Sequence, residues 1–112
     1  MTVYAVQEPR TYNADKDKWL PRVNIYNAKP FGEVTTLIPH DHVHAALVTR
    51  PTLHKLRRGL KDFCDDDYLL PVGDPVLVAL AALTAARENR GRVKFLRWSR
   101  ERREYDVVEA VV

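Results

Sequence analysis

The fold is decided by the stretch DYLLPVGDPVLVALAALTAARENRGRVKFLRW, which spans residues 67–98. Residues 68–72 are almost wholly apolar, which is typical of a short strand that is covered on both faces. Pro71 has no N–H to donate to a sheet ladder, so we expect this strand to be irregular there. Residues 92–98 return to alternating basic and apolar side chains and predict a second strand.

A helix is predicted between these two strands, from Pro75 to about Arg90. Asp74 is a favoured N-cap residue, Pro75 suits the first helical position, and Gly91 suits the helix end. Valine, leucine and alanine occur on nearly every side of this helix, so we expect it to be largely buried. A strand, a buried helix and a strand in succession predict a βαβ unit with parallel strands.

Shorter patterns predict the rest of the fold. We expect strands at residues 2–6, 23–26, 33–38 and 104–112, a polar loop over residues 10–22, and a helix over residues 51–63. The apolar positions of that helix share one face, at spacings of three and four residues: Leu53, Leu56, Leu60 and Phe63. The last strand is most simply antiparallel to its neighbour. These elements predict an α/β fold with a mixed sheet of about five strands and two main helices.

Composition limits the class of protein. The 112 residues are 46% hydrophobic and 29% charged, which is ordinary for one globular domain spanning residues 1–112. The longest apolar stretch, residues 75–86, is too short to span a membrane, and the first residues lack the apolar block of a signal peptide. The single cysteine, Cys64, forms no internal disulfide, so we expect a reducing cytoplasm. A multidomain enzyme, a secreted disulfide scaffold and a membrane protein are therefore not expected.

The charge is unevenly distributed along the chain. The net charge is only +3, but residues 87–105 contain eight basic and three acidic residues. Residues 50–61 contain five basic residues and no acidic one. Four aspartates lie between these two segments, at Asp62, Asp65, Asp66 and Asp67. Such separation of charge bears on the choice of partner.

The segment KFLRWSRERREY, residues 94–105, is the strongest candidate for a binding site. Guanidinium groups bind phosphates in a bidentate manner, and tryptophan or tyrosine rings can stack on unpaired bases. The predicted nucleic-acid-binding residues are Lys94, Arg97, Trp98, Arg100, Arg102 and Arg103 in this segment, with Lys55, Arg58 and Lys61 on the outer face of the helix over residues 51–63. The alternative is a solvated turn, with Phe95 and Trp98 in the core and the acidic residues neutralising half of the arginines.

Two polar clusters could hold a metal ion. His40, His42 and His44 would point the same way in an extended chain, and imidazole is a ligand of zinc, copper or nickel. The four aspartates could hold magnesium. A solvated histidine loop and a polar connection between helix and strand explain the same residues. We therefore expect no metal and no cofactor.

Other catalytic and ligand-binding patterns are weak. Gly73, Asp74 and Pro75 lie where open α/β sheets bind ligands, and a nucleotide phosphate there remains an alternative to a simple helix cap. The charge of Asp74 would repel that phosphate, and no P-loop glycine and lysine pattern accompanies it. Cys64 has no identifiable base partner, and Ser99, the only serine, lies among arginines. An enzyme is therefore less expected than a binding protein.

Four short signatures occur together and in order: VYAVQEP at residues 3–9, PFGEV at 30–34, DYLLPVGDP at 67–75 and GRVKFLRW at 91–98. With these signatures the chain resembles a family of small α/β proteins encoded by bacteriophages and prophages. The resemblance implies a binding protein that acts on phage or host machinery, either nucleic acid or a host defence complex. It implies no activity that could be assigned to particular residues.

Two classes of function follow. The first is a non-enzymatic nucleic-acid-binding module that uses the arginine-rich hairpin and the basic helix face. The second is a protein-binding inhibitor or adaptor that acts on a host complex and could form a homodimer through the valines of residues 107–112.

Overall fold

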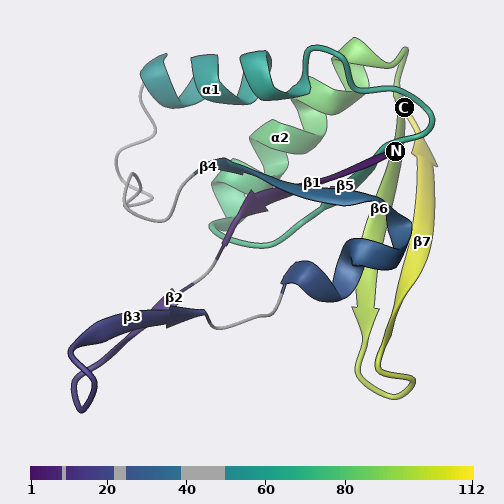
Figure 1. The fold of residues 1–112 in the computed structure, drawn as a ribbon. Helices are drawn as coiled ribbons and strands as arrows, with labels where there is room; N and C mark the ends of the chain where they lie inside the picture. Colours follow the sequence, from purple (N-terminus) through teal and green to yellow (C-terminus); the bar gives the residue numbers. More distant parts are fainter. Residues whose placement is uncertain (9, 22–24, 39–49) are drawn as a thin grey trace.

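The computed structural model describes residues 1–8, 10–21, 25–38 and 50–112. Its elements, in chain order, are β1 (Thr2–Gln7), β2 (Arg10–Asn13), β3 (Lys18–Pro21), the 3-10 helix η1 (Ile25–Phe31), β4 (Glu33–Ile38), α1 (Arg50–Leu60), β5 (Tyr68–Leu70), α2 (Pro75–Glu88), β6 (Arg92–Ser99) and β7 (Glu104–Val111). Figure 1 shows how these elements are arranged around one main sheet.

Five strands form that sheet in the order β4-β1-β5-β6-β7. The first four are parallel, and β7 pairs antiparallel with β6 over all eight residues from Arg92 to Ser99. The predicted mixed five-stranded α/β sheet and the βαβ unit β5-α2-β6 are thereby confirmed. The predicted apolar strand β5 lies at the centre of the sheet and ends at Leu70, one residue before Pro71.

Both faces of the sheet are covered. On one face α1 and α2 lie side by side, and their apolar side chains pack against β1, β4, β5 and β6; η1 lies on the other face, beside β1 and β4 (Figure 1). Leu56, Leu60, Leu69 and Leu77 are fully buried on the first face. Ile25, Leu70 and Leu96 form the core of the second face.

The structure of residues 10–21 shows that one prediction is wrong. We expected a polar loop there, but β2 and β3 form an antiparallel hairpin from Arg10 to Pro21. The turn is stabilised by Asn13, whose Oδ1 accepts a hydrogen bond from the Lys16 N–H at 3.1 Å. Asp17 has φ +49°, a conformation that aspartate tolerates better than most residues. The polar composition therefore marked the hairpin turn and hid the strands beside it.

The predicted strand at residues 23–26 is also wrong for the residues of this range that the structure describes. Residues 22–24 lie outside the described residues, and Ile25 begins the 3-10 helix η1. Ile25 and Ala28 are three residues apart, which places both on one side of a helix with three residues per turn. Both side chains are buried in the second core.

The helix α1 differs little from its prediction, whereas α2 differs in its burial. α1 ends at Leu60, and Phe63 follows it as a buried side chain in the connection. In α2 only Leu77, Ala81 and Ala85 are buried. Val76 and Leu83 are 52% and 68% exposed, so the expectation of a largely buried helix is wrong for the outer side. The two helices lie on the same face of the sheet, and α1 leaves Val76 and Leu83 of α2 exposed.

Candidate functional site

The hairpin of β6 and β7 sorts the predicted basic residues onto two faces of the sheet. Trp98 pairs with Tyr105, and Lys94 with Glu109, on the face that carries η1. Arg97 pairs with Asp106, and because side chains alternate along a strand, it lies on the face that carries the helices.

The turn between β6 and β7 holds the remaining arginines. The Arg102 N–H donates to Ser99 Oγ at 3.3 Å, and Arg103 has φ +52°. All side chains from Arg100 to Glu104 are exposed.

A pocket of about 450 Å³ lies between this turn and η1. It is lined by Asn27, Pro30 and Phe31 from the η1 side and by Trp98, Arg103, Glu104 and Tyr105 from the hairpin. We call it the hairpin pocket. Trp98 is 41% exposed, so the alternative that places it in the core is wrong for Trp98, whereas Phe95 does pack against the core on the helix side of the sheet. Its ring lies 5.0 Å from that of Tyr105 at an angle of 69°, an edge-to-face contact that fixes its position.

Tyr105 forms the buried wall of the hairpin pocket. Its side chain is 8% exposed, and burial raises the pKa of its phenol above the usual value of 10.0. The phenol therefore stays neutral at physiological pH, and the wall of the pocket is uncharged there.

Two of the predicted cationic residues already have partners. Arg102 forms ion pairs with the carboxylates of Asp106 and Glu104, the latter at 3.6 Å. The ammonium group of Lys94 lies 4.4 Å from the centre of the Tyr68 ring, in a cation–π contact. Arg97, Arg100 and Arg103 have no ion pair with any residue in the described part of the chain.

The basic residues of α1 do not join the hairpin. Lys55, Arg58 and Lys61 are exposed on or just after α1, as predicted from the sequence. Figure 1 shows α1 at one side of the molecule and the turn of the β6–β7 hairpin at the opposite side. The basic face of α1 and the arginines of the β6–β7 turn therefore form two separate surfaces.

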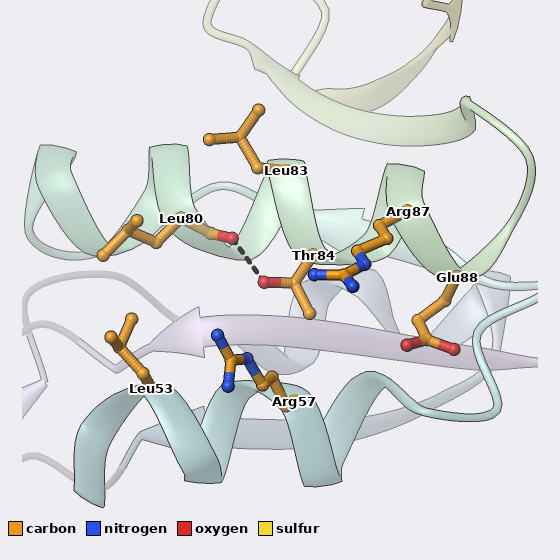
Figure 2. Close-up of a pocket in the computed structure, with 7 residues that line it drawn as sticks. All are labelled: Leu53, Arg57, Leu80, Leu83, Thr84, Arg87 and Glu88. Carbon is orange, nitrogen blue, oxygen red and sulfur yellow. Dashed lines mark hydrogen bonds between the residues drawn. The ribbon is translucent and has the colours of Figure 1, made fainter. Parts of the chain in front are cut away.

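Sequence reasoning missed a second pocket, which we call the helix groove. Figure 2 shows this space of about 580 Å³ between α1 and α2. It is lined by Leu53 and Arg57 from α1 and by Leu80, Leu83, Thr84, Arg87 and Glu88 from α2. The leucine at position 53 was assigned to the buried face of its helix, but it is only partly buried.

The start of α2 is closed by its own side chains. Asp74 is the N-cap, and its Oδ2 accepts hydrogen bonds from the Val76 and Leu77 N–H groups, both at 3.1 Å. Gln7, at the end of β1, accepts the Asp74 N–H through its Oε1, also at 3.1 Å. The cap prediction is confirmed. The amides that would receive a phosphate already have acceptors.

Gly73 allows this closure. It has φ +114°, and a Cβ at this position would lie 2.6 Å from the Cβ of Gln7. Only glycine therefore lets the chain approach the Gln7 side chain in this conformation.

Two of the four clustered aspartates, Asp65 and Asp67, have structural partners. Asp67 is 6% exposed and accepts hydrogen bonds from the N–H groups of Thr2, at 3.0 Å, and of Cys64, at 3.1 Å. The Cys64 thiol also donates to Asp67, at 3.4 Å. Asp65 accepts a hydrogen bond from Asn89 at 2.9 Å. Asp67 thus joins the start of β1 to the loop before β5.

Of the two candidate metal-binding clusters, the structure describes the aspartates but not the histidines. His40, His42 and His44 lie outside the described residues. Within the described ranges, no group of three or more histidine, cysteine or acidic side chains is arranged to hold a metal ion.

The described residues form a small α/β protein whose surface pockets include one that is aromatic and basic and one that is aliphatic and basic. A family model described as phage Pam3 gp32-like protein matches residues 1–111, and the chain belongs to this family. The predicted resemblance to small phage-encoded proteins is thereby confirmed. Comparison with curated proteins and with solved structures gave no match. No helix in the described part of the chain has both the length and the apolar character needed to cross a bilayer.

Proposed function

We propose that this phage protein is a non-enzymatic binding protein that holds single-stranded nucleic acid at the hairpin pocket. The observation that carries the proposal is the half-exposed ring of Trp98 beside Arg103, in a pocket of about 450 Å³. Its setting would be the host cytoplasm, where phage and host nucleic acids are accessible.

An unpaired base suits this pocket better than a duplex does. A base has a flat face that can stack on the Trp98 ring, which Tyr105 holds in position by an edge-to-face contact. Arg100 and Arg103 are exposed on the turn beside the pocket and can pair with the flanking phosphates. Bases inside a duplex are stacked on one another and cannot present this face.

We propose a smaller set of binding residues than the sequence suggested, because some of the basic side chains already have partners. Trp98, Arg100 and Arg103 are central to the proposal. Arg102 and Lys94 are engaged by Asp106, Glu104 and Tyr68. Lys55, Arg58 and Lys61 would contact only a strand long enough to reach the other side of the molecule.

Fluorescence anisotropy of a labelled oligonucleotide tests the proposal. We expect single strands to bind more tightly than duplexes, with an affinity that falls steeply as salt increases. The double substitution Arg100→Ala/Arg103→Ala should weaken binding, whereas Lys55→Ala/Arg58→Ala, which removes the same charge from α1, should weaken it much less. Equal losses in the two variants, or no binding at low salt, would contradict the proposal. Thermal melting of each variant checks that the fold is retained.

A protein-binding adaptor or inhibitor is the second candidate. The observation that favours it is β7, an edge strand of the main sheet with Val107, Val108 and Val111 exposed. An exposed edge can pair with a strand of a partner or of a second copy. Light scattering that gives a monomer mass at high concentration would contradict the homodimer. Pull-down from a bacterial lysate with and without nuclease separates a protein partner from a nucleic-acid partner.

A further inference from the structure

The helix α2 carries more apolar surface than the fold buries. Val76 and Leu83 are largely exposed, and Leu80 is only partly buried. These three residues follow one another at spacings of four and three, so they form one stripe along the helix. We call it the outer stripe. An apolar face of this kind is typical of a helix that a further surface covers.

The helix groove lies beside this stripe and has two chemically different ends. Figure 2 shows Leu53 of α1 opposite Leu80 of α2 at one end. Glu88 of α2 lies at the other end, and between the two ends the guanidinium groups of Arg57 and Arg87 extend from the two helices toward the space between them. A ligand for this site therefore needs an apolar part and, farther along, a negatively charged part.

The charge around the groove is strongly positive. Arg57 and Arg87 are exposed, and neither forms an ion pair with a described residue. α1 has the sequence RPTLHKLRRGL and contains no acidic residue. Among the described residues that line the groove, Glu88 is the one acidic side chain. Two guanidinium groups that have no ion pair with a described residue, close to an exposed apolar surface, are complementary to carboxylates on an apolar scaffold.

We propose that the helix groove and the outer stripe bind an acidic amphipathic helix of a partner protein. Its apolar residues would pack against Leu53, Leu80 and Leu83. Its carboxylates, one or two turns farther along, would pair with Arg57 and Arg87. The space between two packed helices accepts the row of side chains that a third helix presents at spacings of three and four.

Two other occupants fit the site less well. None of the described residues that line the groove is aromatic, so these residues offer no stacking surface for the bases of a nucleic acid. A second copy of this chain would bring the basic surface of α1 against another basic surface, because the described part of the chain contains no acidic amphipathic helix. Like charges would then oppose each other across the interface.

The test uses a synthetic peptide as long as α2, with leucines on one face and glutamates in its second half. Its binding to the full chain is measured by fluorescence anisotropy. Two control peptides are a scrambled sequence of the same composition and a version with lysine in place of glutamate. We expect saturable binding of the acidic amphipathic peptide only. No saturable binding, or equal binding of the scrambled peptide, would overturn the proposal.

Charge reversal assigns the binding to the groove. Arg57→Glu/Arg87→Glu should weaken the acidic peptide by about tenfold or more and should create affinity for the lysine peptide. The matched control Lys55→Glu/Arg58→Glu makes the same change on α1 outside the groove and should have a much smaller effect. Equal effects of the two variants, or displacement of the peptide by a single-stranded oligonucleotide, would overturn the proposal. The hairpin variant Arg100→Ala/Arg103→Ala should leave peptide binding unchanged, so failure of the nucleic-acid proposal is measured separately.

Discussion

The hairpin pocket and the helix groove both place arginines that have no ion pair among the described residues beside apolar side chains, but the apolar side chains differ. The hairpin pocket is lined by Trp98, Tyr105 and Phe31, whereas the helix groove is lined by leucines. Flat aromatic rings stack on bases, and aliphatic side chains pack against other aliphatic side chains. The same basic charge therefore serves different partners in the two regions, and the neighbouring side chains distinguish them.

The two regions also differ in how firmly they are fixed. In the hairpin pocket the Trp98 ring is held by an edge-to-face contact with Tyr105, and on the adjoining turn Arg102 is held by two carboxylates. In the helix groove neither arginine is paired among the described residues, and Leu83 is 68% exposed. The pocket is thus preorganised, whereas the groove has side chains that a partner would order on binding.

The largest expected effect concerns the two sides of α2. Leu77 is fully buried, so Leu77→Ala should lower the free energy of unfolding by about 2–5 kcal/mol, through lost apolar burial and the cavity left behind. Leu83 lies in the helix groove and is largely exposed, so Leu83→Ala should change it by no more than about 0.5 kcal/mol. Urea unfolding measures both. A large loss for Leu83→Ala would show that the outer stripe serves stability, and would weaken its assignment to binding.

A smaller loss of stability is expected for substitution of Asp74 at the start of α2. A phosphate site there would be a third anion-binding region, besides the hairpin pocket and the helix groove. Asp74→Ala should cost about 1 kcal/mol of stability through loss of the helix cap, whereas Asp74→Asn keeps a capping oxygen and should cost little. Thermal unfolding measures both variants, and titration with inorganic phosphate and a panel of nucleotides accompanies it. We expect no phosphate or nucleotide to shift the melting temperature of either variant. A shift would place a phosphate site at the start of α2.

The smallest expected effect is a pH dependence of the free energy of unfolding, and it arises from Tyr105 in the hairpin pocket. Burial raises the pKa of Tyr105 above 10.0, so the folded protein holds the phenol proton more firmly than the unfolded chain does. The resulting stability is present below pH 10 and is lost as the pH rises through the raised pKa. Tyr105→Phe should reduce this alkaline loss, as measured by urea unfolding at several pH values. Tyr4, whose pKa is raised chiefly by burial and then by Asp67, should account for a further part. An unchanged alkaline loss in Tyr105→Phe would contradict the burial of this phenol.

Most of the fold was predictable because it follows from local patterns. The βαβ unit is marked by an apolar strand, by the Asp74 cap with Pro75, and by Gly91 at the end of α2. The β2–β3 hairpin and η1 were not predicted, because their short polar sequences have no clear period. The burial of α2 was overestimated, because an apolar helix sequence does not reveal which sides the rest of the chain covers.

The candidate sites were predictable only in part. The segment around Trp98 was recognised from its composition. Which of its basic residues have partners depends on the fold, because Arg102 pairs with Asp106 and Lys94 contacts the Tyr68 ring. The helix groove was missed, because Leu53 and Leu80 belong to separate helices and come together only in the fold. The surfaces of α1 and of the hairpin looked like one basic site in the sequence and lie apart in the structure (Figure 1).

The most direct test of the account uses the fluorescence of Trp98. The chain has two tryptophans, so Trp19→Phe leaves Trp98 as the only one. Titration of this variant with single-stranded oligothymidylate at low salt should quench and shift its emission in a saturable manner, because a base stacks on the ring. Added salt should reverse the change. Unchanged Trp98 emission would contradict the assignment of the hairpin pocket as the nucleic-acid site. This holds whether or not anisotropy shows that the oligonucleotide is bound.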